Sequence, residues 1–132
     1  MPAHRRGARG RRLALVLLAG LVAGVGTPPV ARAHAIVLES TPAPEARLPA
    51  SPPRVELRFN SRIEKRLSRV TLGRAGAAPS LVPVAVDGDG GPPDRLVVPL
   101  EPLAPGRYVL RYRVMAADGH ITEGSLRFTV DP

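Results

Sequence analysis

Three residues of this chain have the types and spacing that a metal site needs: His34, Asp118 and His120. Asp118 and His120 lie two residues apart in the stretch ADGH, so both side chains point the same way if the segment is an extended strand end. Between them Gly119 relaxes the backbone. A carboxylate and an imidazole are ligand types that suit Cu(II). An Asp-Gly turn followed by an incidental exposed histidine explains the same residues equally well.

His34 becomes a stronger ligand if it is the first residue of the mature chain. A free α-amine has a reference pKa of ~7.7–8 and loses its proton more easily than a lysine side chain. The α-amine and the imidazole Nδ1 can then close one chelate ring on a single metal ion. Two nitrogens in one plane are half of a tetragonal Cu(II) site, and Asp118 and His120 could complete it.

The segment before His34 has the three-part layout of a secretory signal peptide. Residues 1–12 are basic, residues 13–26 form an apolar run, and the tripeptide ARA supplies small residues at the −3 and −1 positions. The apolar run is shorter than the ~20 residues of a membrane-spanning helix. We expect residues 1–33 to be removed, leaving a mature domain of residues 34–132. That domain would be periplasmic or otherwise extracytoplasmic, with no stable membrane anchor; an uncleaved anchor is the alternative.

Charge and composition exclude several functions. The net charge is +8, but six arginines precede His34 with no acidic residue among them, and the remainder carries a net charge of +2. Only two Tyr, two Phe and no Trp are present, too few for a base-stacking surface, so no nucleic acid is expected as a partner. The absence of Cys excludes disulfides, zinc-thiolate sites and a cysteine nucleophile. No nucleophile elbow or P-loop occurs, so no enzyme is expected.

The elements that position the three residues have the pattern of short β-strands. Apolar and polar residues alternate along several segments, and turns rich in proline and glycine separate them. Only residues 61–67 resemble a helix, of one or two turns. The pattern predicts an all-β fold: a small Greek-key β-barrel or immunoglobulin-like sandwich of about seven antiparallel strands. The expected strands are 35–40, 54–59, 69–72, 81–86, 95–100, 106–114 and 125–130.

The stretch PGRY, which ends at Tyr108, is similar to the tyrosine corner of immunoglobulin-like sandwiches. In that corner the tyrosine hydroxyl bonds back to the backbone. A plain tyrosine at the edge of the core is the alternative.

From His34 onward, the chain resembles the CopC family of bacterial copper-resistance proteins. The stretches that carry the resemblance are AHAIVLESTPAPEARL, SPPRVELRFNSRI and, most specifically, PLAPGRYVLRYRVMAADGHITEGSLRFTV. The last is similar to the family pattern PL-x-x-G-x-Y, a strand, D-x-H and G-x-x-x-F-x-V. The resemblance implies a seven-stranded Greek-key barrel that binds one Cu(II) per chain. It implies as ligands the α-amine and imidazole of His34, the carboxylate of Asp118 and the imidazole of His120.

The resemblance also implies a copper carrier or buffer in copper homeostasis or resistance, with a CopD-like inner-membrane copper transporter as a possible partner. Some relatives carry a methionine-rich loop for Cu(I), whereas here the loop reads GRAGAAPSLVPV and Met115 is the only methionine after the leader. We therefore expect no Cu(I) methionine site. Some relatives have an acidic residue in a pattern like F-S-E, where this chain reads FNSR. A neighbouring group should orient His120; the candidates by proximity are Thr122, Glu123 and Ser125.

Two other functions fit parts of the sequence. A histidine-brace copper oxygenase also uses an N-terminal histidine, but normally has a second brace histidine and an extended substrate face. A non-metal immunoglobulin-like interaction domain would need none of the three candidate ligands, and would leave the cleavage point unconstrained.

Overall fold

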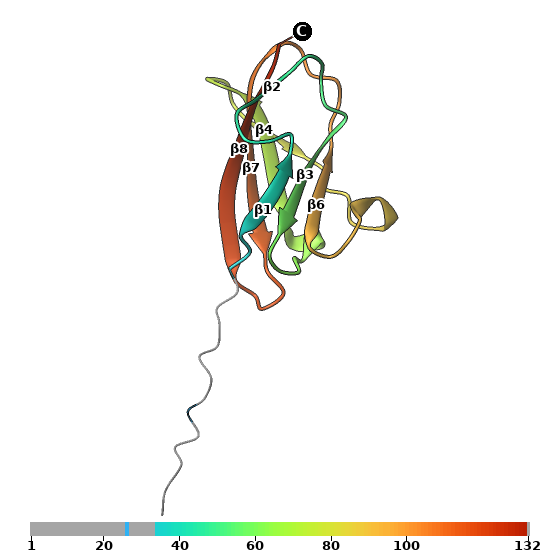
Figure 1. Cartoon of the computed structure of the whole chain (residues 1–132), viewed down its shortest axis with the longest axis vertical. Coiled ribbons are helices and arrows are strands. Elements are labelled where there is room, and N and C mark those ends of the chain that lie inside the picture. Colours follow the sequence, from blue (N-terminus) through green and yellow to red (C-terminus); the bar gives the residue numbers. More distant parts are fainter. Residues whose placement is uncertain (1–25, 27–33, 132) are drawn as a thin grey trace, which may run out of the picture. The chain divides into compact units, whose positions relative to one another are not determined.

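The computed structural model describes Gly26 and residues 34–131. Apart from Gly26, the predicted signal peptide of residues 1–33 lies outside the described residues. The described residues form a β-sandwich of two sheets, with two short 3₁₀ turns and no α-helix (Figure 1). The strands are β1 (Val37–Thr41), β2 (Ala46–Leu48), β3 (Arg54–Phe59), β4 (Arg69–Arg74), β5 (Ser80–Val82), β6 (Arg95–Pro99), β7 (Gly106–Met115) and β8 (Ile121–Val130), and the 3₁₀ turns are η1 (Lys65–Leu67) and η2 (Gly88–Gly90). No helix in this part of the chain is long and apolar enough to cross a membrane.

The strands divide unequally between the two sheets. One sheet has the order β1-β3-β6, and the other has the order β2-β8-β7-β4-β5. Every pairing between these strands is antiparallel except that of β2 with β8, which is parallel. The predicted all-β sandwich is confirmed, and the seven predicted strands pair antiparallel. β2 is an additional strand that the sequence did not predict. This three-residue strand lies in a proline-rich stretch that has no strand pattern of its own.

The core lies between the sheets, where the predicted alternation places it. Val55, Leu57 and Phe59 of β3 are at most 1% exposed, and the residues between them face outward. Their counterparts on the facing sheet include Leu110 and Phe128, which are also buried. Burying side chains of this size stabilises the fold by roughly 1.5–3 kcal/mol each. The core therefore holds the two sheets together without a disulfide.

The predicted tyrosine corner is present. The Tyr108 hydroxyl donates a hydrogen bond of 2.6 Å to the carbonyl oxygen of Ala104, four residues earlier. The Tyr108 ring stacks on Phe128 of β8, with 5.7 Å between the ring centroids. This contact fixes the loop before β7 against the start of that strand.

Two strands and one helix-like segment differ clearly from prediction. The expected strand 81–86 ends at Val82, because Pro83 lacks a backbone donor. Ala85 instead forms an isolated bridge to Val97, in the other sheet. β8 begins at Ile121, four residues earlier than expected, because it pairs with β7 along its whole length. The helix-like segment 61–67 forms only the 3₁₀ turn η1.

Candidate metal centre

The loop between β7 and β8 carries Asp118 and His120. The two strands pair from Gly106 opposite Val130 to Met115 opposite Ile121, so the loop projects from the end of a long hairpin. The loop closes on itself, since Ala116 N–H donates to His120 O at 2.8 Å and Gly119 N–H donates to Ala116 O at 2.9 Å. Gly119 has a φ of +87°, a left-handed value that glycine adopts without strain.

The segment from Asp118 to His120 is therefore a turn, not the extended strand end that the sequence predicted. The two side chains nevertheless meet. The His120 backbone N–H donates to Asp118 Oδ1 at 3.0 Å, and His120 Nδ1 lies 2.9 Å from Asp118 Oδ2. The second distance is short, but its direction is not that of a hydrogen bond, and Nδ1 is buried with no hydrogen-bond partner among the described residues. The turn thus leaves one imidazole nitrogen beside a carboxylate.

Asp118 is held in its ionised form. The backbone N–H of His120 and then the His120 side chain lower the pKa of this carboxyl, because both stabilise its negative charge. The two side chains are 36% and 42% exposed, which leaves both within reach of solvent. A carboxylate and an imidazole are thus presented together at the surface.

A second segment, which leads into β1, lies at the same end of the sandwich as the loop between β7 and β8 (Figure 1), and His34 belongs to this segment. Ala35 is 0% exposed and belongs to the core, so the residue after His34 is anchored. Ile36 is fixed by two hydrogen bonds to Asn60: its N–H donates to Asn60 Oδ1 at 2.8 Å, and its carbonyl oxygen accepts from Asn60 N–H at 2.9 Å. His34 is consequently an exposed residue placed directly before a fixed backbone.

The rings of His34 and His120 lie edge to face, with 5.6 Å between their centroids and 64° between their planes. The structure therefore brings all three predicted ligands to one end of the sandwich, although His34 and His120 are far apart in the sequence. Within residues 34–131, no group of three or more His, Asp or Glu side chains is already arranged to hold a metal ion. In the 132-residue chain the nitrogen of His34 is also a peptide amide, so the predicted chelate requires cleavage.

One residue that positions His34, Asn60, was not predicted. No sequence signal marks Asn60 as the partner of Ile36; it appeared only as part of the stretch FNSR, in which Ser61 stands where some relatives have an acidic residue. Three residues were proposed to orient His120. Of these, Glu123 forms an ion pair with Arg113 at 3.1 Å, and Ser125 is exposed. Thr122 is the one whose hydroxyl is buried, and it has no hydrogen-bond partner among the described residues.

Comparison with known proteins settles the family. A family model described as the CopC domain matches residues 37–131. The chain belongs to the CopC family. The match covers Asp118 and His120 and begins three residues after His34.

Curated relatives agree with this assignment. The chain is 32% identical to copper resistance protein C of Pseudomonas syringae pv. tomato over 113 residues, which cover 82% of this chain and 89% of that protein. It is 29% identical to copper resistance protein C of Escherichia coli over 121 residues, or 87% of this chain and 94% of that protein. The membership of a copper-resistance family predicted from the sequence is confirmed.

Solved structures confirm the fold. The crystal structure of CopC from Methylosinus trichosporium OB3b superposes with a TM-score of 0.66 at 34% identity, covering 75% of this chain and 95% of that one. PcoC, a methionine-rich copper resistance protein from Escherichia coli, superposes with a TM-score of 0.62 at 29% identity, covering 75% and 100%. The sandwich described above is thus the fold of this family.

Proposed function

We propose that this chain, after removal of residues 1–33, is an extracytoplasmic protein that binds one Cu(II) ion and acts as a copper carrier or buffer. The observation that carries the proposal is the approach of the His34 and His120 rings, 5.6 Å apart, beside the ionised carboxylate of Asp118. Cleavage after Ala33 would add the α-amine of His34. Two imidazoles, one amine and one carboxylate are a donor set that suits tetragonal Cu(II).

The residues present fit this cargo. The Nδ1 of His120 has no hydrogen-bond partner among residues 34–131 and lies 2.9 Å from Asp118 Oδ2, so two of the proposed ligand atoms are already side by side. Asp118 is already ionised, so a metal ion need not displace its proton. Ala35 and Asn60 hold the backbone next to His34, which reduces the ordering that binding would require.

The cargo is Cu(II) rather than Cu(I). A thioether Cu(I) site needs several soft ligands. In the proposed mature chain Met115 is the only methionine and cysteine is absent. The protein would therefore pass on Cu(II), and a CopD-like transporter in the inner membrane is the proposed recipient. We propose no enzymatic activity, so the copper-loaded protein should not oxidise chitin or cellulose with peroxide.

The first test is to measure the intact mass of the protein recovered after export. The mass should be that of a chain that begins at His34. Cu(II) is then titrated against a competing chelator, and one equivalent should bind. His120→Ala and Asp118→Asn should each weaken binding, His120→Ala by at least about a hundredfold, since even outer-shell changes at metal sites cost 10–100-fold. Glu123→Gln is the matched control, because it removes a carboxylate on the same hairpin that pairs with Arg113.

One further variant isolates the α-amine. A single glycine placed before His34 keeps both imidazoles and the carboxylate but moves the amine away from the His34 ring. Cu(II) binding should weaken markedly. Undiminished binding by this variant or by His120→Ala would refute the site assignment, and a mature chain that begins elsewhere than His34 would remove its premise.

A further inference from the structure

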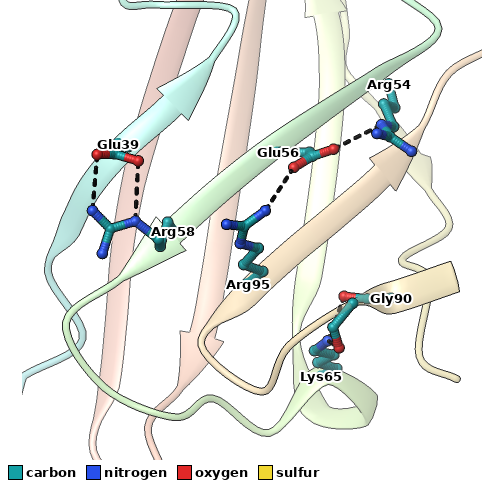
Figure 2. A network of polar contacts seen from close by, with 8 residues as sticks. Glu39, Arg54, Glu56, Arg58, Lys65, Gly90 and Arg95 are labelled. Atoms are coloured by element: carbon teal, nitrogen blue, oxygen red, sulfur yellow. Dashed lines mark hydrogen bonds and ion pairs between the residues drawn. The ribbon is translucent and has the colours of Figure 1, made fainter. Parts of the chain in front are cut away.

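The outer faces of the two sheets differ in how their charges are balanced. On the three-stranded sheet, arginines and glutamates alternate and pair, as Figure 2 shows. Glu39 binds Arg58 at 2.9 Å, and Glu56 lies between Arg54 at 2.7 Å and Arg95 at 3.6 Å. This outer face is therefore covered by a network in which each arginine contacts a carboxylate.

The outer face of the five-stranded sheet is different. Six exposed arginines project from it, because their neighbours along each strand point into the core. Strand pairing sets Arg69 opposite Arg113, and Thr71 between Leu81 and Arg111, so these side chains share one face. We call this surface the arginine face; its arginines are Arg47, Arg69, Arg107, Arg111, Arg113 and Arg127.

Only half of these arginines have acidic partners. Arg47 pairs with Asp131, Arg113 with Glu123 and Arg127 with Glu45. The guanidinium groups of the other three make no ion pair and no hydrogen bond with any described residue; these are Arg69, Arg107 and Arg111. The small net positive charge of residues 34–132 is therefore concentrated on one face.

The shape of the arginine face selects the kind of anionic partner. Arg107 and Arg113 are six residues apart on one strand, which spans about 20 Å, and the face is a sheet surface rather than a deep groove. A hollow of about 460 Å³ is lined by Arg47, Arg107 and Arg127 together with Glu45, so its net charge is positive and it could receive a phosphate group. At the edge of the face, on β5, Leu81 is 73% exposed. A broad basic surface with an exposed leucine at its edge fits a lipid interface.

We propose that the arginine face docks the protein on a membrane surface rich in anionic phospholipids, with Leu81 entering the headgroup region. Basic side chains near an anionic bilayer each contribute about fivefold to binding. Three unpaired arginines therefore contribute about a hundredfold, and Leu81 adds apolar contact to that. This docking involves no metal ligand, so it is independent of the copper site.

The test uses the exported protein, without copper, and vesicles of phosphatidylglycerol mixed with phosphatidylcholine, compared with phosphatidylcholine alone. Co-sedimentation should occur only with the anionic vesicles, and should weaken as ionic strength rises from about 0.01 M to 0.1 M, where the screening length falls from about 30 Å to 10 Å. Replacing Arg69, Arg107 and Arg111 with glutamine should weaken binding about a hundredfold. Replacing the same three with lysine should preserve it, and Leu81→Ser should weaken it at constant charge.

The matched control is the triple glutamine variant of Arg54, Arg58 and Arg95, which removes the same charge from the opposite face. It should still bind the anionic vesicles, and thermal melts should show that both triple variants fold. Equal losses in the two triple variants would overturn the proposal, because net charge alone would then explain binding. So would equal sedimentation with both kinds of vesicle, or failure to bind vesicles together with binding to polyglutamate, which would indicate an acidic protein partner.

Discussion

Replacing Asn60 with alanine tests whether the backbone before β1 is held ready for copper. The variant removes the Oδ1 acceptor of the Ile36 N–H while leaving the backbone bond from Asn60 N–H to Ile36 O in place. One side-chain hydrogen bond of this kind contributes about 0.5–1.5 kcal/mol. The buried methyl group of Ala35 remains, so the segment should stay docked but loosen at His34.

The free energy lost with this hydrogen bond can appear in Cu(II) affinity or in the free energy of unfolding, and the two are measured separately. If copper binding must restore the order that Asn60 provides, Cu(II) affinity should fall by a factor of about 2–5, since 1.4 kcal/mol corresponds to tenfold. The bond is exposed, so the free energy of unfolding should fall by no more than about 1 kcal/mol. Chelator competition measures the affinity, and urea denaturation of the copper-free protein measures the stability.

Asn60→Asp is the control, because it keeps an oxygen acceptor for the Ile36 N–H. Its Cu(II) affinity should stay at or above that of the unmodified protein. If Asn60→Ala binds Cu(II) as tightly as the unmodified protein, the hydrogen bond between Ile36 and Asn60 does not position His34 for copper. The same conclusion follows if Asn60→Asp and Asn60→Ala lose affinity equally.

Three further predictions concern the sandwich itself. Tyr108→Phe removes the hydroxyl of the tyrosine corner and should cost about 0.5–1.5 kcal/mol, which lowers the melting temperature by about 4–8 °C per kcal/mol in a domain of this size; an unchanged melting curve would contradict this. Gly124→Ala should destabilise by about 1–3 kcal/mol, because its Cβ would overlap the Tyr112 ring, and Tyr112→Ala in the same chain should make the Gly124 change nearly neutral in a double-mutant cycle. Glu39 has a pKa below its usual 4.5, first through its hydrogen bond to Arg58 and then through the charge of Arg58. A lowered carboxyl pKa adds stability above pH 4.5, and this stability is lost as the pH falls through the lowered pKa. The difference in the free energy of unfolding between Glu39→Gln and the unmodified protein should therefore shrink in acid. A difference that stays constant with pH would refute the role of the ion pair.

Much of the sandwich could be predicted because alternation and turn residues act locally. Val55, Leu57 and Phe59 alternate with charged residues, and this pattern placed β3 at its observed bounds. The tyrosine corner was found for the same reason, since Tyr108 bonds to a residue only four positions away. Where residues close together in the chain determine a structural element, the sequence alone was enough to predict that element.

The features that were missed depend on partners distant in the chain. β2 exists because β8 offers a free edge, and its three residues carry no pattern that reveals this. Asn60 contacts Ile36 across 24 positions, and nothing in the local sequence distinguishes this Asn from a turn residue. The residue types of Asp118 and His120 indicated that they would meet, but the turn that joins them follows from the hairpin register rather than from an extended strand.

The burial of Ala35 also bears on how long the N-terminus of the mature protein survives. Once the chain is folded, a terminus created at His34 would project by a single residue, since Ala35 is in the core and Ile36 is hydrogen-bonded on both sides. An aminopeptidase that must draw several residues into its active site would first have to undock this segment. The fold would therefore protect its own first residue from trimming, and the export machinery would have to cut before that segment docks.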